Sequence, residues 1–132
     1  QKNFFLNLKE ILKKNKIKNL IISDRLINKK SFFKKIHIYL CTSFSESSPL
    51  SIWEAMSCKI PIISSDIGDI SKIANKKSLI IKNYNPKIFA QAIIKLKRDK
   101  KVYKKFSQNS DFLYKKNFNI INYIKKFDNL FI

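Results

Sequence analysis

Cysteine, histidine and long apolar runs are scarce in this sequence of 132 residues. The two cysteines, Cys41 and Cys58, form no C-x-x-C motif and one pair is not a disulfide framework, so we expect two buried thiols. The single histidine, His37, has no second ligand at metal-binding spacing, so we expect no metal and a structural role at a strand start. No apolar run approaches the roughly 18 residues of a membrane span, and the N-terminus lacks a signal-peptide pattern. These absences argue against a disulfide-rich, metal-binding or membrane-spanning protein.

Acidic residues and arginine are also scarce, whereas lysine is abundant. The chain carries 28 Lys and Arg against 9 Asp and Glu, a formal net charge of +19, which raises the question of a nucleic-acid or anionic-membrane partner. Arg25 and Arg98 are the only arginines, although arginine is the residue that binds phosphates and bases bidentately. The lysines of residues 95–105 alternate with apolar residues at helical spacing, which indicates solvated helix faces. We therefore expect no nucleic-acid partner, and we keep a basic polyanion-binding domain as an alternative.

The chain length fits one domain with a hydrophobic core. The first residue is Gln1 and the only methionine is Met56, so we expect a piece of a longer chain or a processed product. Because no repeat, linker or low-complexity segment marks a boundary, we expect a single domain over residues 1–132.

The apolar pattern alternates between helices and strands. Spacings of three and four predict an amphipathic helix at Lys2–Lys14, and short apolar runs predict buried strands. The expected strands are residues 19–23, 36–41, 60–65 and 78–82, and the other expected helices are 31–35, 49–58, 88–97, 101–115 and 120–130. Strands that are apolar on both faces and separated by helices predict a Rossmann-like, three-layer αβα fold with a parallel sheet and a helical C-terminus. The only glycine, Gly68, is expected in a turn at residues 66–69.

One turn of this pattern is a candidate anion site. Ser48 followed by Pro49 predicts a helix start, with Ser48 capping free N–H groups and Pro49 at the first helical position. In parallel α/β sheets, ligands bind beyond the carboxyl ends of the strands, next to the N-termini of the following helices. Residues 43–48 follow a predicted strand and precede this helix, so a phosphate could bind there.

Two carboxylates flank that helix start. Glu46 lies on the turn, and Glu54 lies in the second turn of the helix beside apolar residues, where an unpaired charge would be costly. Taken alone, Glu54 fits an ion pair with a neighbouring lysine and Glu46 fits an exposed loop acid. Taken together around a bound phosphate, both could accept hydrogen bonds from hydroxyl groups. A ligand with hydroxyls on both sides of a diphosphate is a nucleotide sugar.

Residues 43–68 resemble the nucleotide-sugar domain of retaining GT-B glycosyltransferases, the glycosyl transferases group 1 or family 4. The family pattern is two glutamates with seven residues between them, then Ala-Met, a short turn, Pro-Val-Ile and a glycine-containing loop, and this chain has Pro-Ile-Ile at the corresponding place. The strand at 36–43 and the helices at 86–132 extend the resemblance over nearly the whole chain. It implies that the chain is the C-terminal, donor-binding half of a GT-B fold, without the N-terminal acceptor domain.

The resemblance also implies roles for individual residues. Glu54 would bind the ribose hydroxyls of the donor, and Glu46 would face the donor sugar near the reacting centre as the catalytic residue. The backbone that approaches the diphosphate and the sugar would belong to Ser47, Ser48, Pro49 and Leu50. The implied reaction transfers a sugar from a nucleoside-diphosphate sugar to a glycan or lipid-linked acceptor with retention of configuration, without a metal or another cofactor.

The implied setting is the cytoplasm, with peripheral contact at the inner face of an anionic membrane, in polysaccharide or lipopolysaccharide biosynthesis. The basic pair that clamps the diphosphate in this family would lie upstream of Gln1, so we expect this chain alone to be inactive.

Four positions depart from the family pattern. Ser47 and Lys59 stand where turn glycines are usual, and Asp69 and Lys72 stand where a glycine pair and a glutamate are usual. A side chain at Ser47 would lie where the backbone approaches the sugar most closely. These departures support an alternative function, a non-catalytic remnant or interaction module that keeps the fold.

Overall fold

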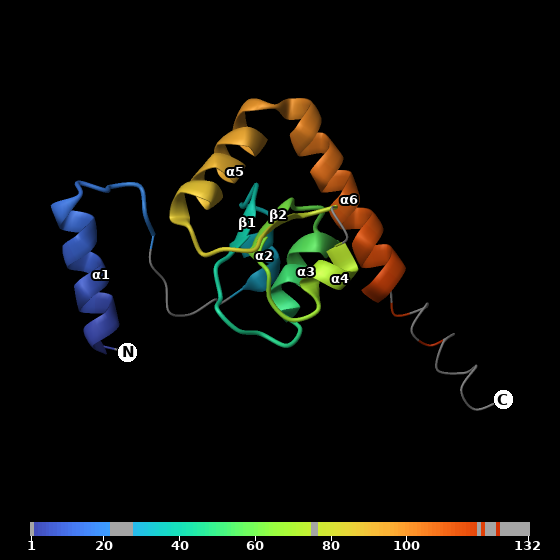
Figure 1. Cartoon of the computed structure of the whole chain (residues 1–132), viewed down its shortest axis with the longest axis horizontal. Helices are drawn as coiled ribbons and strands as arrows, with labels where there is room; N and C mark the ends of the chain where they lie inside the picture. The colour runs from blue at the N-terminus through green and yellow to red at the C-terminus, as the bar shows by residue number, and fades with distance from the viewer. Residues whose placement is uncertain (1, 22–27, 75–76, 119, 121–123, 125–132) are drawn as a thin grey trace.

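The computed structural model describes residues 2–21, 28–74, 77–118, 120 and 124 (Figure 1). Its helices are α1 (Lys2–Lys14), α2 (Lys29–Phe33), α3 (Leu50–Ser57), α4 (Ile70–Ala74), α5 (Pro86–Arg98) and α6 (Lys100–Phe118). Its strands are β1 (Tyr39–Cys41), β2 (Ile62–Ser65) and β3 (Leu79–Ile81).

The strands form a parallel three-stranded sheet in the order β1-β2-β3. Leu40 of β1 pairs with Ile63 of β2, and Ile63 pairs with Leu79 of β3. Helix α5 lies on one side of the sheet, whereas α3 and α4 lie on the other (Figure 1). This arrangement confirms the predicted Rossmann-like, three-layer fold with a parallel sheet.

Two buried clusters fill the space between the layers. Because side chains alternate along a strand, neighbouring residues of β2 enter different clusters: Ile62 packs under α3, and Ile63 packs under α5. Helix α6 is long enough to close both, since Phe106 packs against the α5 cluster and Leu113 belongs to the α3 cluster. The whole β2 strand is buried, so the sheet is covered on both faces at its centre.

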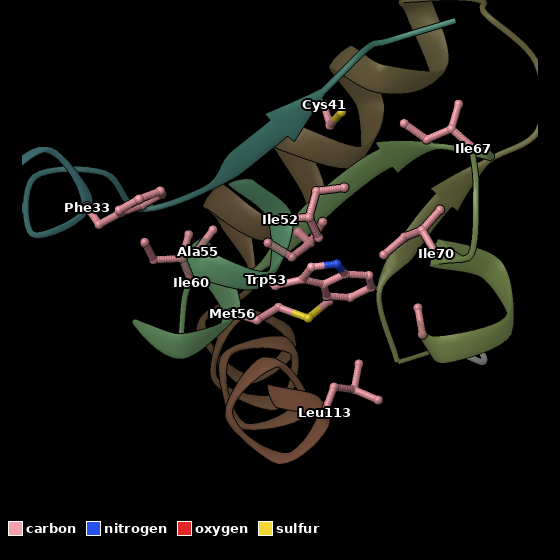
Figure 2. Close-up of a cluster of buried hydrophobic side chains, with 12 residues drawn as sticks. Phe33, Cys41, Ile52, Trp53, Ala55, Met56, Ile60, Ile67, Ile70 and Leu113 are labelled. Atoms are coloured by element: carbon pink, nitrogen blue, oxygen red, sulfur yellow. The ribbon is translucent and has the colours of Figure 1, made fainter. Parts of the chain in front are cut away.

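Helix α3 is held against α6 by an aromatic contact. The Trp53 indole lies among Ile70, Met56 and Leu113 in the α3 cluster (Figure 2). Its ring stacks on Phe118 of α6 with centroids 4.3 Å apart. Such a pair contributes about 0.5–1.5 kcal/mol beyond the area that it buries, so α6 fixes the helix that carries Glu54.

Helix α1 lies apart from the other elements (Figure 1). Its apolar side chains Phe4, Leu6 and Ile11 are exposed, Phe4 at 66% and Ile11 at 54%, and none of the others is buried. No helix among the described residues is long and apolar enough to cross a membrane.

The predicted helices and the observed ones agree best where the apolar period is long. α1 has the predicted bounds, and α5 and α6 differ from prediction by a few residues at their ends. Helix α2 begins at Lys29 instead of Ser31, because the Asn28 side chain accepts a hydrogen bond from Ser31 N–H and caps the helix there. Helix α4 was not predicted, because one turn is too short to show a period.

Some predictions are wrong or fall outside the described residues. Residues 19–21 are not in a strand, and the rest of the predicted strand at 19–23 lies outside the described residues, as does most of the predicted helix at 120–130. All three strands are shorter than expected, since β1 begins at Tyr39, β2 at Ile62 and β3 at Leu79. The start of β2 is displaced because Ile60 N–H bonds to the Ala55 carbonyl after α3 and Pro61 has no N–H to donate. Cys41 is a buried free thiol, but Cys58 is exposed at the C-terminus of α3, so the prediction of two buried thiols is wrong.

Candidate functional site

A cavity of about 530 Å³ opens where α2, β1 and the start of α3 meet. Five of the six predicted site residues line it, and only Ser47 does not: Glu46, Ser48, Pro49, Leu50 and Glu54. The other walls come from Lys29, Phe32 and Phe33 of α2, Tyr39 of β1 and Ser51 of α3. A larger cavity of about 690 Å³, between β3 and α5, contains none of the predicted site residues. We take the smaller of these two cavities as the candidate site because two carboxylates and the first turn of a helix line it together.

The turn that carries Glu46 is fixed by hydrogen bonds from the end of β2 and from the segment after β3. Ser65, at the end of β2, donates its hydroxyl to the Ser43 carbonyl at 2.6 Å. Tyr84, after β3, donates to the Phe44 carbonyl at 3.0 Å, and the two rings stack with centroids 4.4 Å apart. The turn is therefore held in place before any ligand binds, while the Glu46 side chain itself is exposed.

The only glycine of the chain locks the other side of this turn. Gly68 has φ +53°, and a Cβ atom there would lie 2.1 Å from the Ser47 carbonyl oxygen and 2.6 Å from that of Glu46. Asp69, the next residue, donates its N–H to the Ser47 carbonyl at 3.2 Å. Only glycine tolerates both the left-handed backbone and this approach, so Gly68 sets the position of the Glu46–Ser47 backbone.

The start of α3 differs from the prediction. Pro49 is the N-cap residue and the helix begins at Leu50, so the prediction that Ser48 caps the helix is wrong. The Ser48 hydroxyl is engaged elsewhere, because it donates to Asp69 Oδ2 at 3.1 Å and accepts from Trp53 Nε1 at 3.0 Å. Pro49 makes no side-chain cap, and the Ile52 N–H bonds to the Pro49 carbonyl at 2.9 Å. Among the described residues, the helix-start N–H groups left without a cap from Pro49 are those of Leu50 and Ser51, and both residues line the cavity. They carry partial positive charge and can attract an anion.

Ser47 occupies the position where the family usually has glycine. Apart from Gly68, the only described residues with positive φ are Lys16 and Lys59, so the Ser47 backbone needs no glycine. Its side chain is exposed, and its carbonyl accepts the bond from Asp69. The serine is therefore compatible with the fold.

Glu54 is paired with a lysine. Lys29 Nζ lies 2.8 Å from Glu54 Oε1, and the Glu54 side chain is 37% exposed. The ion pair predicted as one alternative for Glu54 is therefore present, although the lysine comes from α2, 25 residues earlier in the sequence. Glu46 is an exposed loop acid, as its own alternative predicted.

Tyr39 adds a phenol to the wall of the cavity that the two carboxylates line. Burial raises the pKa of Tyr39, and the hydrogen bond with the Ser51 side chain partly opposes this effect. The neighbouring Cys41, Glu54 and Glu46 add smaller contributions that raise the pKa further. Tyr39 therefore stays neutral and can donate a hydrogen bond.

Sequence reasoning missed Lys29 and the aromatic wall of this cavity. Asn28, a favoured N-cap residue just before a short apolar pair, was a usable signal for a helix starting at Lys29. No local pattern links Lys29 to Glu54, because a helix–helix contact across 25 residues depends on the tertiary fold. His37 is exposed two residues before β1, and its carbonyl accepts a hydrogen bond from the Tyr103 hydroxyl at 3.0 Å. The described residues contain no cluster of three potential metal ligands.

A parallel sheet covered by helices on both faces, with a candidate anion site beyond its carboxyl edge, places the chain in the Rossmann-like class of α/β domains. A sequence profile described as glycosyl transferases group 1 matches residues 1–111. The chain belongs to this family, and its fold is that of the C-terminal half of a GT-B protein. No relative among the curated proteins matches the chain.

Two solved structures share this fold. The C-terminal domain of LpcC, a glycosyl transferase group 1 family protein from Francisella tularensis, has a TM-score of 0.76 at 20% identity, over 89% of this chain and 64% of that one. Sucrose-phosphate synthase from Thermosynechococcus elongatus has a TM-score of 0.79 at 16% identity, over 94% of this chain and 32% of that one. The chain thus spans less than two thirds of either protein. At these low sequence identities, the similarity to the two solved structures shows a shared fold and nothing more.

Proposed function

We propose that this chain forms the nucleoside-diphosphate-sugar-binding side of a retaining glycosyltransferase. The observation on which the proposal rests is that Glu46, Glu54 and the first turn of α3 all line one cavity. In this proposal Glu54 accepts hydrogen bonds from the ribose hydroxyls, and the free N–H groups of α3 face the diphosphate. Glu46 faces the donor sugar on the pre-formed turn.

The proposed chemistry is electrostatic. Negative charge develops on the departing diphosphate as the bond to the sugar breaks, and donors fixed at that point stabilise it. The N-terminus of α3 supplies such donors without reorganisation, because the turn before it is held by hydrogen bonds from Ser65, Tyr84 and Asp69. The proposal needs neither a metal nor another cofactor.

The remaining components lie outside this chain. The proposed acceptor, a glycan or a lipid-linked sugar, would bind to an N-terminal domain, which would also complete the donor site and make the enzyme active. We also propose contact with the inner face of an anionic membrane. A run of exposed basic side chains at the junction of α5 and α6 supports this contact: Lys95, Lys97, Arg98, Lys100, Lys101, Lys104 and Lys105. Vesicles with and without anionic lipid would test this contact, since binding to both alike would contradict it.

Calorimetric titration with UDP, GDP and ADP tests the donor site. Glu54→Gln should lower the affinity for the tightest-binding of these nucleotides by roughly 10–100-fold, because a hydrogen bond to a charged group contributes about 1.5–3 kcal/mol. Glu46→Gln should leave the affinity within about twofold and reduce sugar transfer by the full-length enzyme. Glu10→Gln, on the distant helix α1, is the matched control. Equal affinity in wild type and Glu54→Gln would contradict the assigned role of Glu54.

The Lys29–Glu54 ion pair supports a second candidate function. A carboxylate already paired within the protein fits a non-catalytic module that keeps the fold without the chemistry. Sugar transfer by the full-length protein would remove this candidate, and absence of any nucleotide binding would favour it.

A further inference from the structure

Lys29 contacts the proposed ribose-binding carboxylate and has no role in the function proposed above. Its ammonium lies 2.8 Å from Glu54 Oε1, and its side chain is 65% exposed. The residue is held at the start of α2 by the Asn28 cap, which fixes the backbone from which the lysine reaches across to α3. An ion pair this exposed adds little to stability, because solvent screens it. Stability therefore gives no strong reason for the contact.

The helix that carries Lys29 also makes its position unfavourable for a positive charge. Lys29 lies in the first turn of α2, where the helix dipole makes a positive charge unfavourable. Among the described residues that line the cavity, the charged ones are Lys29, Glu46 and Glu54. Without Lys29, Glu54 would have no cationic partner among the described residues that line the cavity. The contact with Glu54 therefore offsets a position that is otherwise unfavourable for a lysine.

The ion pair leaves Glu54 able to bind a ligand. A carboxylate has two oxygens and about four acceptor positions, of which Lys29 uses one, at Oε1. The two hydroxyl groups of a ribose can take the other positions without displacing the ammonium. Because Glu54 is more than one-third exposed, an unpaired side chain could also turn toward solvent.

We infer that Lys29 is a positioning residue, which holds the Glu54 carboxylate toward the cavity so that it accepts hydrogen bonds from the vicinal hydroxyls of a nucleoside diphosphate. This inference rests on the proposed function and adds a residue from α2 to it. Lys29 acts through Glu54, so its effect should require both the carboxylate and the ligand hydroxyls.

The test compares Lys29→Met and Lys29→Arg with Lys30→Met, a matched lysine on the same helix that does not line the cavity. Each variant is titrated with the tightest of UDP, GDP and ADP and with the 2′,3′-dideoxy form of that nucleotide. Lys29→Met should lower the affinity for the ribose form of the nucleotide about tenfold, which is near the effect of one charge-assisted hydrogen bond. The same variant should leave the affinity for the dideoxy nucleotide, which is already low, unchanged. Lys29→Arg and Lys30→Met should bind both forms as tightly as the wild type does.

A double variant, Lys29→Met with Glu54→Gln, should bind no more weakly than Glu54→Gln alone. Equal weakening of the ribose and dideoxy forms would overturn the inference, because Lys29 would then act on the phosphates. Tighter binding by Lys29→Met would overturn it as well, because the lysine would then compete with the ligand. If the wild type binds none of the three nucleotides, the proposed function fails and the inference with it; if the wild type binds and Lys29→Met has no effect, only the inference fails. Urea unfolding of each variant confirms that it is folded.

Discussion

At Lys59 the backbone is left-handed, with φ 61°, directly after the C-cap residue Cys58 of α3. Glycine is favoured at this position, because a Cβ atom in the left-handed region costs about 1–2 kcal/mol. The family resemblance had marked the same position as a replaced glycine. The lysine gains little in return, because its ammonium lies 3.8 Å from Asp111 Oδ2 in an exposed pair. Lys59 is therefore a residue that the fold tolerates at a cost.

Lys59→Gly should stabilise the protein. The relieved strain exceeds the extra backbone entropy that glycine loses on folding, so the free energy of unfolding should rise by about 0.5–1 kcal/mol. Urea denaturation of the two proteins measures this difference. Lys59→Ala is the matched control, because it removes the ammonium but keeps the Cβ atom, and it should give no gain. A gain from alanine equal to that from glycine would contradict strain as the cause.

At the scale of elements, the sequence predicted long helices with a regular apolar period better than features that depend on tertiary contacts. α1, α5 and α6 were predictable because several turns of apolar residues recur with one period. The start of α3 was not, because Ser48 looked like a cap but bonds to Asp69 and Trp53, which come together only in the folded chain. In the same way the sequence indicated both carboxylates of the cavity, yet it could not identify Lys29 as the partner of Glu54. Local signals predict elements, and tertiary contacts decide which side chains they present.

Helix α6 contains an acid whose charge is stabilised by the fold. The hydrogen bond from Lys115 at 2.8 Å lowers the pKa of Asp111, and the nearby Lys59 charge adds to this effect. Because the folded protein favours the charged form, this contribution to stability is fully present above the ordinary pKa of about 3.9 and is lost as the pH falls through the lowered value.

Asp111→Asn should therefore cost stability at pH 7, and the difference from the wild type should shrink as the pH falls below about 4. Urea unfolding at several pH values between 7 and 3 measures it. Asp99→Asn is the control, because Asp99 Oδ1 accepts from the N–H groups of Lys101 and Val102 and an asparagine can keep both bonds. A difference for Asp111→Asn that stays constant over this range would contradict the assigned role of the charge.

At the scale of the molecule, the parallel sheet explains why the site lies where it does. The carboxyl ends of β1, β2 and β3 meet at one edge, and residues that follow each strand meet there too. Ser43 follows β1, Ser65 ends β2 and Tyr84 follows β3, and their hydrogen bonds join them in the turn before α3. The rigidity of the turn is therefore a property of the whole sheet. Helix α1 takes no part in it.

Removing residues 1–21 should consequently leave the rest of the fold intact. The apolar side chains of α1 are absent from both buried clusters, and Phe4, Leu6 and Ile11 are more than half exposed. The free energy of unfolding should change by less than about 0.5 kcal/mol, as for changes away from packed contacts. Leu113→Ala, in the α3 cluster, should instead lose about 2–5 kcal/mol by creating a cavity. Urea denaturation of both variants makes the comparison, and a loss of 2 kcal/mol or more on removing α1 would show that this helix packs against the sheet in solution.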